Sequence, residues 1–258
     1  MRGTTRALSV AAFALGALVM GGCSHTWYQF EVSQVERSHI DATKNALAAT
    51  QANPNALAQV VDLEGRRGAE ALIAGMSAQS NQGDAQVERL SRVLYLAIMG
   101  DAEDPLAALD QDMTMAGARV AQRIAQGGLN QMGLGGLAAM VGVVGDDDGQ
   151  RLREMSVSLQ RGQPQTCGPF DVIVSYDAGI LGHIHTSITD NDATYQAWKQ
   201  RVQAVHLVRF TCATNHMLVV MTRNRGEAGL RVIGWHFVTQ AQWESMRPGL
   251  RHAFDLPQ

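Results

Sequence analysis

HLVRFTCATNHMLVVMTRNRGEAGLRVIGWHFV, residues 206–238, is the stretch that decides the fold. Thr214 and Asn215 form a tight turn inside it, and residues 224–229 form a looser one. These turns separate three segments rich in branched and aromatic residues: HLVRFTCA (206–213), HMLVVMTR (216–223) and LRVIGWHFV (230–238). The stretch therefore predicts three consecutive antiparallel strands.

The flanking residues predict two more strands and two helices. These are the strands DVIVSY (171–176) and HIHTSI (183–188), and the helices DATYQAWKQRVQAV (192–205) and 240–246. Asp190 or Asp192 is the expected N-cap of the first helix. Neighbouring strands joined by hairpins predict an antiparallel sheet with helices on one face, so residues 150–258 are expected to form a small α+β domain.

Residues 33–123 predict a helical region, because alanine is abundant and apolar residues recur three and four positions apart. The apolar positions are Ile40, Leu47, Leu57, Val60, Val61, Ala69, Leu72, Ile73, Met76, Val87, Leu90, Val93, Leu94, Ala97 and Ile98. Turn residues at 53–55, 81–84 and 100–105 separate the helices. This pattern indicates a bundle or paired helical hairpins ahead of the sheet.

Residues 124–149 form a connector rich in glycine and apolar residues, of which 124–145 carry no charge. Three interpretations remain open: a buried or flexible linker, a membrane-inserting hairpin or helix, and a close-packed helix in a bundle. The connector ends at residues 146–149 (DDDG), which lack the ligand spacing of a calcium-binding loop and predict a solvated turn.

The N-terminus has the layout of an export signal. Arg2 and Arg6 precede an apolar stretch at 7–20 that is short for a transmembrane helix. The following Met20-Gly21-Gly22-Cys23 resembles the lipobox of bacterial lipoproteins, although Met20 stands where leucine is usual. The resemblance covers residues 1–23 only. It implies that residues 1–22 are a cleaved signal peptide and that Cys23 carries acyl chains that hold the protein in a lipid bilayer.

Two further features bear on location. Ser24 resembles the residue that directs Gram-negative lipoproteins to the outer membrane, which implies an anchored protein facing the periplasm or the cell surface. Residues 23–32 contain TWYQFEV (26–32), whose alternation predicts a strand, with aromatic contacts to lipid headgroups as the alternative. We therefore expect a folded body close to the membrane.

Composition excludes some partners and suggests a disulfide. Without residues 1–22, 19 Lys and Arg stand against 24 Asp and Glu, a net charge of −5, so nucleic acid is not an expected partner. Once Cys23 is assigned to lipid, Cys167 and Cys212 remain, and an oxidising compartment favours a disulfide between them. The alternatives are two buried thiols or a reactive Cys167.

Catalytic signals are weak. On a strand, His183 and His185 would share a face and could supply two metal ligands, but no third ligand is fixed by spacing. There is no G-x-S-x-G elbow, and Ser175 has no histidine partner that the sequence can assign. No P-loop or dinucleotide motif is present, so no cofactor is expected.

The sequence thus favours an envelope lipoprotein with a non-catalytic binding or accessory role and a possible protein partner. The competing hypotheses are a metal-dependent hydrolase built on His183 and His185, and a membrane-active protein that inserts residues 124–145.

Overall fold

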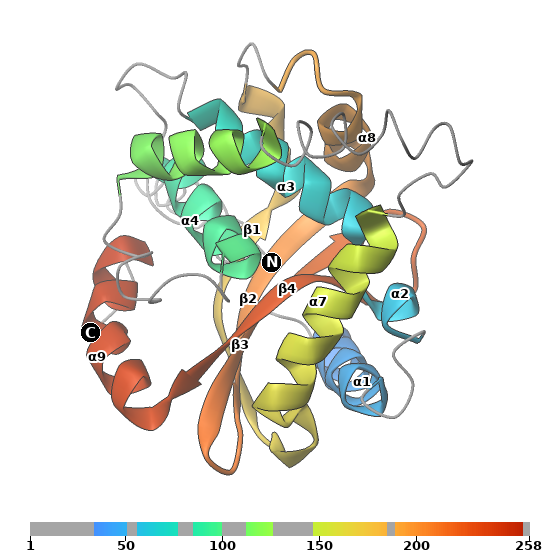
Figure 1. Ribbon diagram of the computed structural model, residues 1–258, viewed down its shortest axis with the longest axis vertical. Coiled ribbons are helices and arrows are strands. Elements are labelled where there is room, and N and C mark those ends of the chain that lie inside the picture. The colour runs from blue at the N-terminus through green and yellow to red at the C-terminus, as the bar shows by residue number, and fades with distance from the viewer. Residues whose placement is uncertain are drawn as a thin grey trace, which may run out of the picture.

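The computed structural model of the 258-residue chain describes residues 34–50, 56–76, 85–99, 112–125, 147–184 and 189–254. Its centre is a four-stranded antiparallel sheet in the order β1-β2-β3-β4 (Figure 1). The strands are β1 (Phe170–Asp177), β2 (Val202–Thr211), β3 (Asn215–Asn224) and β4 (Leu230–Thr239). The three-strand meander expected at 206–238 is confirmed, and the protein has the predicted α+β class.

Helices cover both faces of the sheet (Figure 1). One face carries α3 (Leu63–Met76), α4 (Ala85–Met99), α8 (Ala193–Arg201), α9 (Gln240–Phe254) and a helix at 113–125. The other face carries α1 (Gln34–Ala49), α2 (Leu57–Val60) and α7 (Asp147–Gly162). The prediction of helices on one face is therefore wrong.

The central strand explains why two helical layers are needed. In β3, Leu218 and Val220 contact the α3–α4 side, while Met217, Val219 and Met221 contact the α1–α7 side. All of these side chains are buried. A strand that is apolar on both faces needs cover on each of them, because burial of each apolar side chain stabilises the fold by about 1.5–3 kcal/mol. The helical region expected at 33–123 accordingly shares its core with the sheet.

The loop after β1 differs from the prediction. The strand expected at 183–188 is wrong for its first two residues, because residues 178–183 form the 3-10 helix η3 and Ile184 follows it. Asp177 caps this helix by accepting a hydrogen bond from the Gly179 N–H. The buried residues Ala178, Leu181 and Ile184 lie three apart, a spacing that a 3-10 helix places on one side. Residues 185–188 lie outside the described residues.

Two helix boundaries also differ. The helix expected at 192–205 has the predicted Asp192 cap, whose Oδ1 accepts from the Tyr195 N–H at 2.7 Å, but it ends at Arg201. From Val202 the chain is in β2, where Val205 pairs with Tyr176 of β1. The final helix, expected at 240–246, continues to Phe254 with Pro248 inside it.

Arg66 and Gly234 fix α4 on the sheet. The Arg66 guanidinium donates to the carbonyls of Ala97 and Ile98 in the last turn of α4, and to Ile233 of β4. A cation there complements the exposed carbonyls of a helix C-terminus. A Cβ on Gly234 would lie 2.3 Å from the Ala97 oxygen, so only glycine admits this approach.

Several expectations fall on residues that the structure does not describe. These are the signal peptide at 1–22, Cys23 and the strand at 26–32, and most of the 124–149 connector. The solvated turn expected at 146–149 is wrong where it is described, because α7 begins at Asp147. Across the described ranges, no helix combines the length and apolar character needed to cross a bilayer.

Candidate functional site

The residues singled out by sequence are not brought together in one site. His183 is the last residue of η3 and not part of a strand, so the argument that it shares a face with His185 no longer holds. His185 lies outside the described residues. Among the described side chains, no three His, Cys, Asp or Glu residues are grouped so as to hold a metal ion.

The predicted disulfide is present between Cys167 and Cys212. It joins the segment before β1 to the residue after β2, and both half-cystines are buried. Backbone hydrogen bonds from Gly168 N–H to the Thr211 carbonyl and from Thr211 N–H to the Pro169 carbonyl flank it. With its sulfur in this bond, Cys167 is not available as a nucleophile.

The sheet instead pairs Ser175 with His206. The two residues are register partners on β1 and β2, and Ser175 Oγ lies 2.8 Å from His206 Nδ1. Both side chains are on the α1 side of the sheet, the side to which Val208 and Phe210 of β2 also point. Strand pairing therefore supplies the histidine partner that the sequence could not assign to Ser175.

Glu36, in the first turn of α1, completes the group. Its Oε1 lies 3.4 Å from His206 Nε2 and 3.2 Å from Arg223 Nη1 of β3. The cluster thus links α1 to three strands. We call Glu36, Ser175, His206 and Arg223 the α1 cluster.

Burial lowers the tendency of His206 to take up a proton. His206 has no exposed surface, and Ser175 and Glu36 are also buried. Burial lowers the pKa of His206 below its ordinary value; the Glu36 carboxylate raises it in part, and the Arg223 cation lowers it further. A neutral imidazole fits the contacts when Ser175 donates to Nδ1 and Nε2 carries the proton. Nε2 then lies 3.4 Å from Glu36 Oε1 but makes no hydrogen bond to it.

The order serine, histidine, carboxylate is that of a nucleophile, its base and an orienting group. A nucleophile must also reach a substrate, and Ser175 is only 2% exposed. In this conformation the α1 cluster acts as a polar tie between α1 and the sheet.

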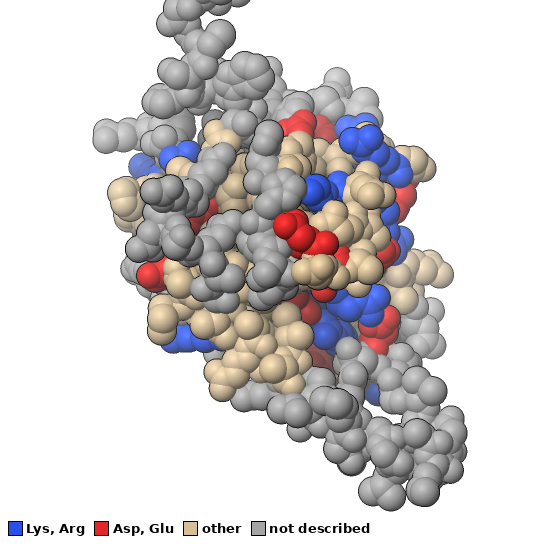
Figure 2. Space-filling view, turned by 90° about the horizontal axis from the view of Figure 1, so that it is seen from above, with Lys and Arg blue, Asp and Glu red and all other residues tan. Residues whose placement is uncertain are grey.

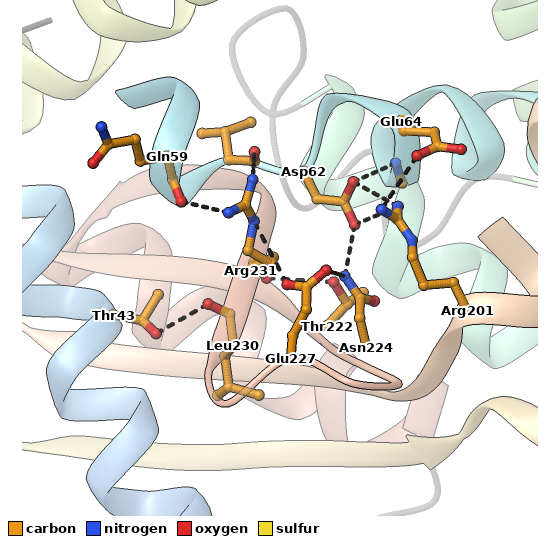
Figure 3. A network of polar contacts seen from close by, with 12 residues as sticks. Thr43, Gln59, Asp62, Glu64, Arg201, Thr222, Asn224, Glu227, Leu230 and Arg231 are labelled. Carbon is orange, nitrogen blue, oxygen red and sulfur yellow. Dashed lines mark hydrogen bonds and ion pairs between the residues drawn. The ribbon is translucent and has the colours of Figure 1, made fainter. Parts of the chain in front are cut away.

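A second buried cluster is centred on Asp62, just before α3 (Figure 3). Its carboxylate accepts from the Gly65 N–H at 2.8 Å, from Arg201 Nη2 at 2.9 and 3.0 Å, and from Asn224 Nδ2 at 3.1 Å. Arg201 ends α8 and Asn224 ends β3. Asp62 therefore caps α3 and ties it to two other elements.

Beside it, Arg231 of β4 holds α2 (Figure 3). Its guanidinium donates to the carbonyls of Gln59 at 2.6 Å, Ala58 at 3.4 Å and Val61 at 3.0 Å. The same segment extends the sheet, because Val61 forms a parallel bridge with Val232 and the Asp62 N–H donates to the Val232 carbonyl. Both clusters thus join helices to the sheet.

The described part of the face in Figure 2 does not carry charges of a single sign. Figure 2 shows Lys and Arg side chains interspersed with Asp and Glu on the described part of that face. A backbone-binding surface for nucleic acid requires clustered cations.

Comparison with known proteins gives no relative: no protein family, characterised protein or solved structure shows significant similarity to the chain.

Proposed function

We propose that the protein is a lipid-anchored component of the bacterial envelope, held through acylated Cys23, with a non-catalytic binding or accessory role. The sequence Met20-Gly21-Gly22-Cys23 after an apolar stretch is the observation that carries this proposal. Acyl chains on one residue are sufficient for stable anchoring, since each buried CH₂ contributes about 0.8 kcal/mol. The outer membrane, facing the periplasm, is the location that Ser24 favours.

The disulfide supports export. Bonds of this kind form and persist in oxidising compartments and are rare in the cytosol. Cys167 and Cys212 are bonded within the buried core on the α1 side. This supports a folded body that matures outside the cytoplasm.

The role proposed for that body is to present a surface to an envelope partner. Glu36 and Asp62 are buried, and each ties helices to the sheet, which supports a single scaffold at neutral pH. Such a scaffold, with helices on both faces of its sheet, suits recognition through the outer helix surfaces, such as that of α7 (Figure 1).

The test of anchoring is metabolic labelling with an alkyne fatty acid in a Gram-negative host. The full-length chain should take up label and partition into membranes, whereas Cys23→Ser should do neither. Equal labelling of the Cys23→Ser variant, or no labelling of the full-length chain, would overturn the anchoring proposal.

The test of the non-catalytic role uses a fluorophosphonate probe for activated serines. Folded protein should remain unlabelled at Ser175, because the side chain is buried. Labelling that is lost in both Ser175→Ala and His206→Gln variants would instead assign a hydrolase and overturn the non-catalytic proposal.

A further inference from the structure

The contact between α1 and the sheet contains a histidine, the side chain whose ordinary pKa lies nearest neutral pH. His206 of β2 faces Glu36 from α1, Arg223 from β3 and Ser175 from β1. Of these neighbours, Glu36 and Arg223 are the charged groups that act on the imidazole, and Ser175 is neutral. The remaining α1 contacts include one further cation, Lys44, whose Nζ donates to the Cys167 carbonyl. The others are apolar or neutral: Ile40 and Leu47 are fully buried, and Thr43 donates to the Leu230 carbonyl.

When α1 is docked on the sheet, which we call the closed form, the α1 cluster accommodates a neutral imidazole better than a charged one. Glu36 and Arg223 already balance each other at 3.2 Å. A proton added to His206 places two cations beside the Glu36 carboxylate. The Arg223 side chain is 42% exposed and keeps water around its charge, whereas the new charge on His206 has no access to water. A buried charge without its own counter-ion is costly, so the closed form resists protonation.

Movement of α1 relieves this cost. Glu36 belongs to the first turn of α1, and α1 supplies Ile40 and Leu47 to the core on the His206 side of the sheet. When that helix lifts, water reaches the imidazole and can solvate its charge. We propose that α1 is a pH-dependent latch, docked on the sheet at neutral pH and released from it in acid by protonation of His206.

The sign of the effect follows from linkage. The closed form holds the pKa of His206 below its ordinary value of about 6.5, and the open, hydrated form restores that value. Below about pH 6.5 the open form therefore binds a proton that the closed form lacks. The opening equilibrium constant rises by up to about tenfold per pH unit until the closed form also takes up the proton.

This latch is independent of lipid attachment. It rests on described residues alone, so it can stand if Cys23 proves to be unmodified. The α1 helix is the described element nearest Cys23 in the chain, which gives the latch a role in an anchored protein: it would control how closely the body is held to its anchor.

The experiment is hydrogen exchange by mass spectrometry on the full mature chain in detergent, between pH 7.5 and 5.5. Rates are corrected for intrinsic exchange and read separately for α1 and for α4 on the opposite face. Below pH 6.5 the exchange protection of α1 should fall by up to about tenfold per pH unit, while the protection of α4 changes less. Protection of α1 that is constant, or that falls only in step with α4, would overturn the latch.

Two variants identify the group. His206→Gln should make α1 protection independent of pH, whereas His216→Gln, which replaces a buried histidine bonded to Gln240 at the start of α9, should leave the pH dependence intact. An unchanged pH dependence in a folded His206→Gln variant would overturn the assignment.

If His206→Gln does not fold, Arg223→Gln provides the second test. Removal of this cation raises the pKa of His206 in the closed form. The pH range over which α1 loses exchange protection therefore becomes narrower. The fold-loss of protection between pH 6.5 and 5.5 should therefore be smaller than in the unsubstituted chain. An equal or larger loss would overturn the role of His206.

Discussion

Asp62 and Arg201 form an unequal pair: the side chain of Asp62 is 4% exposed, whereas that of Arg201 is 30% exposed. The carboxylate keeps three kinds of partner, since Gly65, Asn224 and Arg201 all donate to it. The guanidinium also reaches Glu64 at 3.2 Å and water. The loss of Arg201 and the loss of Asp62 should therefore have different effects on stability.

Arg201→Met should destabilise the protein more than Asp62→Asn. The first leaves a buried carboxylate without its cation and should lower the free energy of unfolding by about 3 kcal/mol. The second keeps an N-cap side chain and leaves only a partly exposed cation, with a cost of about 1 kcal/mol. Urea unfolding of both variants measures the order, and the reverse order would contradict this reading of the pair.

Gly234→Ala should destabilise the chain by about 2 kcal/mol or more, because the new methyl group meets the backbone of α4 at Ala97. Gly249→Ala in α9 is the matched control: its Cβ meets nothing within 4 Å, and alanine favours a helix by about 0.5–1 kcal/mol. The melting temperature should fall for Gly234→Ala and rise for Gly249→Ala. Equal effects would indicate that α4 does not approach β4 as described.

Cys167→Ser/Cys212→Ser should lower the free energy of unfolding by about 4 kcal/mol, the chain-entropy value for a sequence separation of 45 residues. Dithiothreitol should reproduce the loss in the unsubstituted chain and have no effect on the double variant. Equal stability of the oxidised chain and the double variant would contradict a structural role for the bond.

The Ser175–His206 contact should show energetic coupling. Ser175→Ala removes the donor to a buried ring nitrogen and should cost about 1–3 kcal/mol. The same substitution in a His206→Phe background should cost less, by about 0.5–3 kcal/mol in a double-mutant cycle. A coupling energy of zero would show that the hydrogen bond contributes nothing to folding.

The free energy of unfolding should also fall as pH decreases from about 6.5, because the unfolded chain then takes up a proton at His206 that the folded chain resists. The His206 contribution is present above that pH and is lost as pH falls toward the lowered pKa. Denaturant midpoints of the unsubstituted chain and His206→Gln, compared from pH 7.5 to 5.5, measure it. Parallel curves would contradict the assignment.

Local patterns in the sequence predicted local structure well. A tight turn joins β2 to β3 as expected, but it is centred on Ala213 and Thr214, one residue earlier than predicted, and Asn215 begins β3. Asp192 caps α8 as expected. The pairing of Cys167 with Cys212 followed from the count of cysteines once Cys23 was set aside. Each of these depends on neighbouring residues or on simple chemistry.

Features that depend on distant residues could not be read in this way. His183 and Ile184 were expected to begin a strand, but Asp177 caps a 3-10 helix that runs to His183 and places Leu181 in the core. The partner of Ser175 became visible only through the β1–β2 register, and Glu36 lies 139 positions before Ser175 in the chain. Both helical layers were implied by the apolar residues on each face of β3, which a strict alternation rule overlooks.

The bridge between Val61 and Val232 has a consequence for solubility. An open sheet edge offers unpaired N–H and C=O groups that can recruit a second chain, and the short segment at Val61 covers part of the β4 edge. Arg231 keeps that segment in place through its carbonyl contacts. An Arg231→Ala variant should therefore aggregate faster than the unsubstituted chain in light-scattering assays. Arg231 would then limit self-association through the β4 edge.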